Sequence, residues 1–453
     1  MGIYKTGTPT ASTTSVFMVA NIAASESRAV ATVDFPGAFL HSSMPDDGPP
    51  VYVRLNKFET KVLVAIDKSY AKYVQKNGTC VVKLKRALYG CVEAARLWYE
   101  KLRRDLEAMG YKVNDCDMCV FNRIESDGTQ STLVVHVDDL MVTACSEGHI
   151  DVIITELSAS YRNLSIQRGR KLDYLGMVFD FTVKGKCKIT MDGYVKDLLV
   201  FFEKITGVAK TPAGDDIFKV NDGEEALDKE KREYYHSGTA KLLYLGKRVR
   251  PDLLTAVSFL AKRVQQPTVE DYRKLERVVK YLRGSKHLGI VLEGNKNMAV
   301  LGYVDASYGV HGDYKSHTGT IIGIGKGPIY AKSASQKINT KSSSEAELVG
   351  LSDSAGYVIW VRNFLIAQGY DVGPAKIFQD NQSAIALVKN GKSNSDRTRH
   401  IAIRFFFVAD RVRSKEISIE YLRTGEMVAD ILTKPIQGSL FIKLRNLLLN
   451  WSE

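Results

Sequence analysis

Cysteine is scarce in this sequence, with six residues among 453. That number is too small for the disulfide framework on which small secreted domains depend, so we expect the thiols to be reduced. Cys116 and Cys119 form one CxxC pair, but no second pair follows nearby. Because a structural zinc site needs about four ligands, we predict that these two side chains are buried or half-buried thiols.

Long apolar runs are also missing. No stretch approaches the ~20 consecutive apolar residues of a membrane-spanning helix, and the N-terminus lacks the apolar core of a secretory signal. We therefore expect no membrane partner. Internal repeats and low-complexity segments are absent as well. Hydrophobic residues make up 45% of the chain and charged residues 25%, so the sequence predicts two or three ordinary globular domains.

The charge balance is positive, with a net charge of +12. This favours a polyanionic partner such as nucleic acid, although a generally basic enzyme has the same balance. Residues 241–290 contain twelve lysines and arginines against four acidic residues. One predicted helix there carries a basic surface formed by Arg273, Lys274, Arg277, Lys280 and Arg283. That surface is either a solvated face or a nucleic-acid-binding one.

Three aspartates lie at the ends of apolar strands in the first third of the chain. Asp34 ends one predicted strand, and Asp138 and Asp139 join two others. Adjacent carboxylates repel each other where water is scarce, and Mg²⁺ prefers oxygen ligands. A plain polar turn is the alternative. Tight turns favour Asn-Gly or Asp-Gly, so the doubled aspartate favours a metal site.

After Gly294 the pattern changes to three strands, a helix, a strand, a helix, a strand and a final helix. This order predicts an α/β module of about 150 residues. Four acidic residues in it fall at strand ends or near helix starts: Asp305, Glu347, Asp380 and Asp430. Any one alone would be a helix cap or a surface acid. Together they could converge on two ions ~4 Å apart, the arrangement that hydrolyses or forms phosphodiesters.

Short motifs follow one another in a characteristic order along nearly the whole chain. They are VDFPGAFL from Val33, ALYG from Ala87, VDDL from Val137, YLG from Tyr174, GYVDA from Gly302, SSSEAE from Ser342, DNQSA from Asp380 and ADILTK from Ala429. In this order and number, the motifs resemble the reverse transcriptase and ribonuclease H portion of a copia-type LTR retrotransposon Pol polyprotein.

The resemblance implies an α/β fold class in three parts. We expect an α+β palm with partial fingers of a right-hand polymerase in residues 1–192. A basic helical thumb and connection follows in 193–295, and a ribonuclease H-like α/β domain in 296–453. The implied function is RNA- and DNA-templated DNA synthesis together with cleavage of RNA in RNA–DNA hybrids.

In the polymerase part, the resemblance implies that Asp34, Asp138 and Asp139 are catalytic and hold two Mg²⁺ ions, with Mn²⁺ as an alternative. Phe39 matches the family's aromatic steric gate, which excludes a ribose 2′-hydroxyl. Without the family, its residue type would favour a core aromatic.

Other motif positions match substrate-binding segments. Tyr89 and Gly90 correspond to the lining of the incoming nucleotide pocket, and Leu175 and Gly176 to the strand that grips the primer end. The basic helix in residues 241–290 would follow the duplex backbone.

In the C-terminal part, Asp305, Glu347, Asp380 and Asp430 match the ribonuclease H carboxylates, which would hold two more Mg²⁺ ions. The implied partners are an RNA template, a DNA primer, an RNA–DNA hybrid and deoxynucleoside triphosphates. Integrase and protease of the same element would accompany them. The resemblance also implies a cytoplasmic location in virus-like particles, with the nucleus as a further candidate location.

Two features depart from the family pattern. His136 stands where a tyrosine is usual, and we read it as a tolerated core residue. Only 33 residues precede Asp34, so the fingers are expected to be truncated and polymerisation is the less secure activity. The alternatives are a ribonuclease H with a defective polymerase, and an inactive nucleic-acid-binding remnant of a degenerate element.

Overall fold

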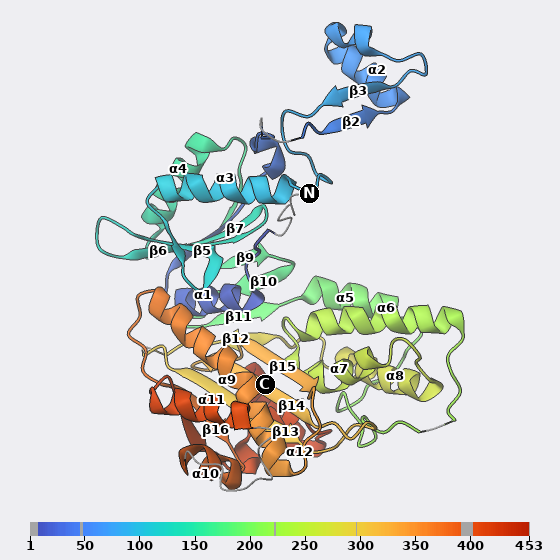
Figure 1. The fold of residues 1–453 in the computed structure, drawn as a ribbon, viewed down its shortest axis with the longest axis vertical. Coiled ribbons are helices and arrows are strands. Elements are labelled where there is room, and N and C mark those ends of the chain that lie inside the picture. The colour runs from blue at the N-terminus through green and yellow to red at the C-terminus, as the bar shows by residue number, and fades with distance from the viewer. Residues whose placement is uncertain (1–7, 46–48, 222, 296, 391–401, 453) are drawn as a thin grey trace.

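The computed structural model describes residues 8–45, 49–221, 223–295, 297–390 and 402–452. Sheets and helices alternate along the chain, as the predicted α/β class requires. Figure 1 shows an N-terminal part above, a helical part on the right and a C-terminal α/β part below. In these described ranges, no helix has both the length and the apolar character to cross a bilayer.

A six-stranded sheet with the order β4-β5-β6-β7-β1-β8 forms the centre of the N-terminal part. Its strands are β1 (Ala29–Asp34), β4 (Lys112–Asn114), β5 (Asp117–Ile124), β6 (Gln130–His136), β7 (Asp139–Ala144) and β8 (Ser165–Arg168). Nearly every residue of β1, β6 and β7 is buried, because strands covered on both faces consist of almost continuous apolar runs. A turn at Asp127-Gly128 joins β5 to β6.

Helices cover both faces of this sheet. Figure 1 shows α3 (Ala94–Ala108) and α4 (Glu147–Ser160) above it and α1 (Thr13–Ser25) below it. The helical spacing of Trp98, Leu102 and Leu106 predicted one apolar face of α3, and all three side chains are buried. Helix α1 is enclosed more completely, since every residue of 15–24 is buried. It packs against β6 and β7 above and against β11 and β12 below.

Between β1 and α3 the chain forms a small projecting subdomain, visible at the top of Figure 1. After the turn η1 (Ala38–His41), a two-stranded sheet pairs β2 with β3. Its elements are β2 (Tyr52–Leu55), α2 (Lys57–Ile66), η2 (Lys68–Tyr73) and β3 (Cys80–Lys83). Its side chains are largely exposed, as the 80% exposure of Ile66 illustrates, so little apolar packing ties it to the sheet.

A second sheet with the order β12-β11-β10-β9 lies below the first. Its strands are β9 (Lys171–Tyr174), β10 (Met177–Asp180), β11 (Cys187–Thr190) and β12 (Ile290–Leu292). The connection between β10 and β11 contains Lys184-Gly185-Lys186. Strand β12 lies within residues 193–295, which the resemblance assigns to the helical thumb and connection, yet it pairs with β11. The helical segment therefore leaves this sheet and returns to it.

The helical part contains α5 (Asp192–Phe201), α6 (Lys229–Gly246), η3 (Pro251–Leu253), α7 (Leu254–Lys262) and α8 (Val269–Gly284). A fully buried ion pair lies at its centre. The Arg250 guanidinium donates to both carboxylate oxygens of Asp252 at 2.9 and 2.7 Å, and both side chains have 0% exposure. Arg250 also donates to the carbonyl and hydroxyl of Ser285, and Tyr281 donates to Asp252 at 2.7 Å. Every charge is therefore paired.

The C-terminal part is a five-stranded mixed sheet with the order β15-β14-β13-β16-β17. Its strands are β13 (Val300–Ser307), β14 (His317–Ile324), β15 (Tyr330–Ser335), β16 (Ala375–Gln379) and β17 (Ile417–Tyr421). Its helices are α9 (Ser343–Ala367), α10 (Gln382–Asn390), α11 (Ala402–Arg413), η5 (Thr424–Glu426), η6 (Val428–Leu432) and α12 (Gly438–Leu449). The predicted strand and helix order is confirmed, except that two helices, not one, lie between β16 and β17.

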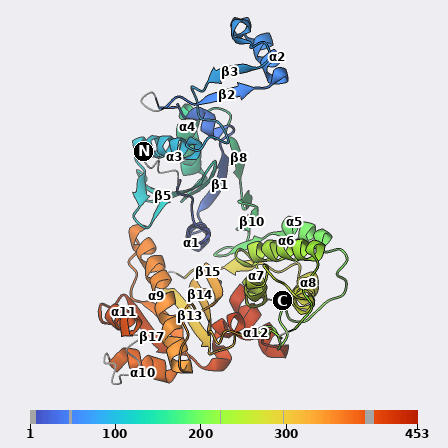
Figure 2. The ribbon, with the colours of Figure 1, turned by 45° about the vertical axis from the view of Figure 1, so that its right-hand side comes forward.

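Helix α9 connects the C-terminal sheet to the N-terminal part, as Figure 2 shows. Near its C-terminal end, the Trp360 indole donates to the carbonyl of Cys116 at 3.2 Å. Just beyond the helix, the carbonyl of Gln368 accepts from the Gln130 side chain at 2.9 Å. Glu347 lies near the other end of the same helix. The two predicted active sites therefore belong to parts of the chain that are directly packed together.

Candidate active sites

The first carboxylate group forms where β1 meets the connection between β6 and β7. Asp34 is the register partner of Asp139 in the antiparallel β1–β7 pair, and directly opposed residues project from the same face of a sheet. Asp138 lies in the connection, where its carbonyl accepts from the N–H of Phe35 at 3.2 Å. The structure therefore brings all three predicted residues to one end of the sheet.

The connection that presents Asp138 is conformationally strained and held from outside. Val137 has φ of 60°, a left-handed value that is costly for a β-branched residue. The buried Trp98 of α3 donates its indole N–H to the Val137 carbonyl at 2.6 Å. Its ring also packs edge-on against Phe35, with centroids 5.3 Å apart. Trp98 of α3 thus fixes the connection between β6 and β7 that carries Asp138.

The electrostatics of this group favour a cation. Burial, and then the charge of Asp138, raise the pKa of Asp34. Burial also raises the pKa of Asp139, with further contributions from Asp138 and Asp34. Asp34 and Asp139, whose ionisation is disfavoured, fit a divalent ion with oxygen ligands. Their ligand atoms do not, however, all lie within 4.8 Å of one another in the part of the chain that the structure describes.

Tyr89 and Phe39 lie beside these acids. The Tyr89 hydroxyl donates to Oδ2 of Asp138 at 3.1 Å, and its ring packs against that of Phe39 with centroids 4.3 Å apart. Phe39 is 8% exposed and Tyr89 is 52% exposed. Gly90 has φ of 95°, which other residues rarely adopt. The tyrosine, glycine and phenylalanine predicted to bind nucleotide therefore flank the carboxylates, with Tyr89 as the accessible surface.

Leu175 and Gly176 form the turn between β9 and β10. Their φ angles of 53° and 73° are those of a two-residue hairpin turn with both positions left-handed. The neighbouring Tyr174 donates its hydroxyl to the Val134 carbonyl at 3.0 Å, and the charge of Asp139 contributes to raising the Tyr174 pKa. This predicted primer-binding hairpin is therefore anchored close to the palm carboxylates.

The second carboxylate group is more compact. Asp305 lies on β13, Glu347 in the first turns of α9 and Asp380 directly after β16. One oxygen of each lies within 4.8 Å of the others, and the first two side chains are 1% and 4% exposed. The parallel pairing of β13 with β16 brings the carboxyl ends of both strands to one edge of the sheet. Asp305 and Asp380 meet there.

Asp430 joins this group through a lysine. It lies in η6, and its Oδ1 is 2.7 Å from Nζ of Lys434. The same ammonium lies 3.3 Å from Oδ1 of Asp305, whose other oxygen accepts a short hydrogen bond from Thr433. The four predicted acids therefore share one site, in which three carboxylates are grouped directly and the fourth is bridged by Lys434.

Burial and mutual repulsion dominate the titration of this site. Burial, Asp305 and Asp380 raise the pKa of Glu347 to about 9. Burial and Asp305 raise the pKa of Asp430 to about 7. Burial disfavours the charged form of Lys434, but the negative charges of Asp305 and Asp430 outweigh this effect and raise the pKa of the lysine. Buried oxygen donors that repel one another in this way fit a hard divalent cation.

Gln379 is a positioning residue to which the sequence assigned no role. It is fully buried, and its Nε2 donates to Oε2 of Glu347 at 3.1 Å. Its Oε1 accepts from the backbone N–H groups of Asp380 and Asn381 at 2.8 and 2.9 Å. One amide thus fixes two of the acidic residues. A buried polar residue immediately before Asp380 was the available sequence signal, but its contacts depend on the fold.

The predicted basic surface of α8 is not a free row of cations. Lys274 is 5% exposed and donates to the Lys219 carbonyl at 2.6 Å. Arg277 donates to Thr211 at 2.8 Å, and Arg283 to the Ile205 carbonyl at 2.7 Å. These three side chains hold neighbouring loops, because backbone carbonyls and hydroxyls of those loops face them.

The remaining two basic residues of α8 are more accessible but paired. Arg273 is exposed and forms ion pairs with Glu270 and Asp216. Lys280 lies 3.7 Å from Glu276. Nucleic-acid contact remains a prediction for Arg273 and Lys280, whose ion pairs are accessible to solvent.

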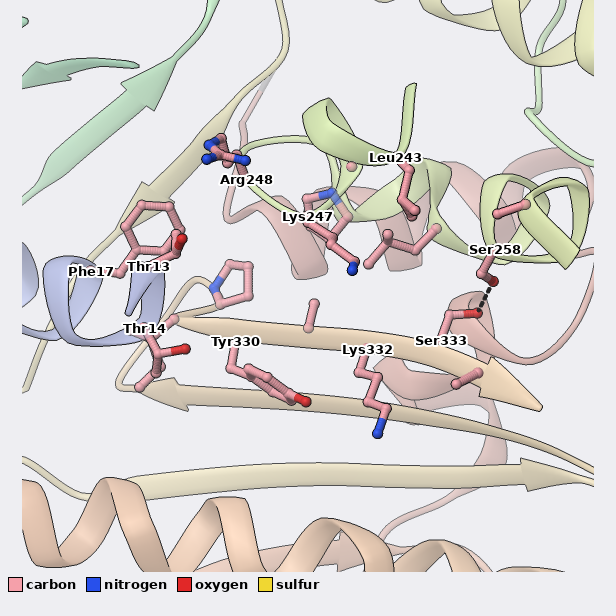
Figure 3. A pocket seen from close by; sticks show the side chains of 18 residues that line it. Thr13, Thr14, Phe17, Leu243, Lys247, Arg248, Ser258, Tyr330, Lys332 and Ser333 are labelled. Atoms are coloured by element: carbon pink, nitrogen blue, oxygen red, sulfur yellow. Dashed lines mark hydrogen bonds between the residues drawn. The ribbon is translucent and has the colours of Figure 1, made fainter. Parts of the chain in front are cut away.

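A cavity of about 480 Å³ lies where the three parts meet (Figure 3). Figure 3 shows residues of α1, the end of α6 and β15 around it, with Lys247, Arg248 and Lys332 among them. The Arg248 guanidinium stacks 3.6 Å from the ring centroid of Tyr244. None of the three cations forms an ion pair with a described acidic residue. Figure 3 shows Lys247 extending toward β15, whereas Lys332 extends from the opposite side of that strand, where its Nζ lies 5.4 Å from the ring centroid of Tyr357.

The chain resembles known proteins along most of its length. Residues 2–212 match the family described as reverse transcriptase (RNA-dependent DNA polymerase). The chain is 29% identical over 447 residues to the retrovirus-related Pol polyprotein from transposon RE1 of Arabidopsis thaliana, covering 96% of this chain and 28% of that protein. Transposon RE2 of the same plant gives 28% identity over 448 residues, with 96% and 29% coverage. The chain thus spans less than a third of these relatives.

A solved structure shares the fold. The foamy viral protease-reverse transcriptase in complex with an RNA/DNA hybrid matches with a TM-score of 0.51 and 12% identity, covering 87% of this chain and 44% of that one. The sequence motifs, the family match and the transposon relatives agree. Residues 2–212 of this chain therefore match the reverse transcriptase family, and the chain as a whole is similar to the retrovirus-related Pol polyproteins of transposons.

Proposed function

We propose that the N-terminal part synthesises DNA on RNA and DNA templates. The observation that carries this proposal is the register pairing of Asp34 with Asp139 beside the turn residue Asp138. The family match over residues 2–212 supports it. Mg²⁺ is the proposed cofactor, with Mn²⁺ as an alternative, because the donors are carboxylate oxygens.

The chain's own residues have distinct roles in this proposal. Asp34, Asp138 and Asp139 hold two divalent ions, which when bound activate the primer 3′-hydroxyl and stabilise the pyrophosphate leaving group. Tyr89 orients the Asp138 carboxylate through its hydroxyl and offers an exposed ring to the incoming deoxynucleotide. Phe39 supports that ring and limits the space beside it.

For the C-terminal part, we propose cleavage of the RNA strand in RNA–DNA hybrids. The main observation in support of this proposal is that carboxylate oxygens of Asp305, Glu347 and Asp380 lie within 4.8 Å of one another. These residues, with Asp430, would hold two Mg²⁺ ions, which when bound polarise the scissile phosphate and activate the attacking water. Gln379 fixes the orientation of Glu347. Lys434 balances the charge of Asp305 and Asp430.

The proposed substrates are an RNA template, a DNA primer, their hybrid and deoxynucleoside triphosphates. The cavity beside Lys247 and Arg248 lies between the two carboxylate-bearing parts, and we assign these two cations a phosphate-backbone contact. In an element of this family, integrase and protease would accompany the chain in cytoplasmic virus-like particles and, later, in the nucleus.

Separate inactivation of the two sites tests the proposal. Asp138→Asn should abolish Mg²⁺-dependent primer extension on both templates and leave hybrid cleavage within twofold of the unmodified chain. Asp380→Asn should do the reverse. Matched controls are Asp151→Asn and Glu420→Gln, exposed acids in surface ion pairs of the same two parts. They should leave both activities unchanged.

If either catalytic substitution removed both activities in a folded chain, the assignment of two independent sites would be wrong. Loss of neither activity would contradict the residue assignment. A folded, hybrid-binding chain that turns over neither substrate with Mg²⁺ or Mn²⁺ would instead support the inactive remnant.

A nuclease with a defective polymerase is the second candidate. The compactness of the C-terminal group favours it, since the three polymerase carboxylates are less tightly grouped among the described residues. Hybrid cleavage without primer extension in the unmodified chain would support this candidate. Extension that Asp138→Asn removes would exclude it.

A further inference from the structure

A different kind of ligand cluster lies at the end of the palm sheet opposite the catalytic turn. Asp127 occupies the β5–β6 turn, Cys145 follows the end of β7, and His149 lies in the first turn of α4. One potential ligand atom of each lies within 4.8 Å of the others. Cys145 is six residues along from Asp139, about 20 Å at ~3.3 Å per strand residue. The cluster is therefore separate from the polymerase carboxylates.

The distances in this cluster suit a transition-metal ion. Oδ2 of Asp127 lies 3.8 Å from Sγ of Cys145 and 3.5 Å from Nε2 of His149. Sγ lies 3.1 Å from the other imidazole nitrogen, Nδ1. In a tetrahedral zinc site, with bonds of about 2.0–2.3 Å, neighbouring ligand atoms are roughly 3.3–3.8 Å apart. The two distances from Asp127 agree with this range within about 0.1 Å. Because Sγ contacts Nδ1, coordination through Nε2 also requires the imidazole and the Cys145 side chain to move relative to each other.

Neighbouring hydroxyl groups orient the ligands. The backbone N–H and the hydroxyl of Thr129 both donate to Oδ1 of Asp127, at 2.9 and 2.6 Å, which leaves Oδ2 for the cluster. The Ser146 hydroxyl lies 2.8 Å from Nδ1 of His149, which leaves Nε2 as the available nitrogen. Outer contacts that fix ligating carboxylates and imidazoles in this way accompany most protein metal sites.

The ligand chemistry distinguishes this cluster from the two magnesium sites. Thiolate and imidazole ligands favour zinc-like ions, whereas Mg²⁺ prefers oxygen. Cys145 and Asp127 are exposed, so water can complete the coordination. The CxxC thiols of Cys116 and Cys119 are not part of such a group among the described residues.

We propose that Asp127, Cys145 and His149 form a zinc-binding site with water as the fourth ligand. On binding, the metal–sulfur bond replaces the thiol proton of Cys145, which is released to solvent. The ion would tie the β5–β6 turn to the start of α4 and so stabilise the outer end of the palm. This proposal depends on neither the polymerase nor the nuclease assignment.

Cobalt substitution tests the site directly. The full chain is titrated with Co²⁺ in millimolar Mg²⁺, which occupies the oxygen-only sites. One equivalent should produce a thiolate-to-cobalt charge-transfer band that Zn²⁺ then removes, and Zn²⁺ should raise the Tm. Cys145→Ser should lose the band. His149→Gln and Thr129→Val should each weaken binding about tenfold or more.

Cys116→Ser is the matched control, because its thiol is half-buried on the same sheet, and it should retain the full band. All four variants change side chains at or near the surface, so circular dichroism can confirm folding. The proposal is overturned if one equivalent of Co²⁺ gives no thiolate band. It is also overturned if Cys145→Ser keeps the band or the zinc-dependent rise in Tm.

Discussion

The ammonium of Lys434 lies 2.7 Å from the carboxylate of Asp430 in the C-terminal site, where a metal-binding reaction centre is proposed. Because it also lies 3.3 Å from Asp305, one lysine compensates two buried acids. A bound divalent ion would share that electrostatic role. The lysine should therefore matter most when divalent ions are absent.

Replacing Lys434 by methionine tests this relationship. Lys434→Met keeps most of the apolar stem and leaves Asp305 and Asp430 without their cation. In EDTA, we expect the free energy of unfolding to fall by about 1–3 kcal/mol, allowing for the partial exposure of the lysine. Mg²⁺ should then raise the Tm of the variant more than that of the unmodified chain. Equal magnesium-dependent shifts would contradict the shared role. Lys376→Met, which breaks an exposed pair with Glu420, is the control.

Gln379 provides a prediction about positioning. Gln379→Leu keeps the side-chain volume but removes the contact to Glu347 and the acceptor for two backbone N–H groups. We expect Mg²⁺ affinity in the hybrid-cleavage assay to fall about 10- to 100-fold, with primer extension unchanged. A purely structural role would lower cleavage at all Mg²⁺ concentrations alike, so the magnesium dependence is the decisive measurement.

The sequence predicted the strands and the acidic residues well, because both leave local signals. Apolar runs bounded by aspartates marked β1, β6 and β7, and the spacing of apolar residues marked α3. The pairing of Asp34 with Asp139 requires β1 and β7 to be neighbours in the sheet. The motif order, and not periodicity, indicated that they are neighbours.

Contacts made by single polar side chains were not predictable. The basic residues of α8 looked like a nucleic-acid-binding surface. Lys274, however, donates a hydrogen bond to the carbonyl of Lys219, which lies 55 residues away in sequence. Lys434 and Cys145 gained their partners in the same way. Such pairings depend on loop paths, which propensity and periodicity do not specify.

The buried pair of Arg250 and Asp252 predicts a large stability effect far from either active site. Arg250→Met leaves Asp252 buried with the Tyr281 hydroxyl as its one remaining side-chain donor among the described residues. Breaking a fully buried pair costs about 3–5 kcal/mol, which urea denaturation can measure. Arg103→Met, which breaks an exposed i,i+4 pair with Glu107, should cost less than about 0.5 kcal/mol. Similar losses in both variants would show that the buried network contributes no more than a surface pair.

Phe39 allows the steric-gate and core interpretations to be separated. If its ring limits the space for the sugar, Phe39→Ala should increase ribonucleotide incorporation relative to deoxynucleotide incorporation, with the ratio of kcat/KM values as the measurement. If it serves only as packing under Tyr89, the variant should lose stability, by about 3 kcal/mol or more for a buried aromatic, without a change in that ratio. Tyr89→Phe keeps the ring contact and serves as the control.

Two buried histidines predict a pH dependence. His311 and His317 lie side by side, with Nε2 and Nδ1 2.9 Å apart. Burial, with help from Lys262, lowers the pKa of His311 to about 4 despite the opposing charge of Asp313. Burial lowers the pKa of His317 to about 3. Below the unfolded pKa of about 6.5, the unfolded chain therefore binds protons that the folded chain does not.

Stability should consequently fall as pH drops from about 6.5 toward 4, by at most ~1.4 kcal/mol per pH unit for each histidine. Glu347 and Asp430 act in the opposite direction, since their pKa values are raised to about 9 and 7. The contributions of Glu347 and Asp430 cancel when the unmodified chain is compared with His317→Gln, because both proteins contain these two acids. The stability gap between the two proteins should narrow below pH 6.5, because the variant lacks the titrating group. Parallel stability curves for the unmodified chain and His317→Gln would refute the buried neutral histidine.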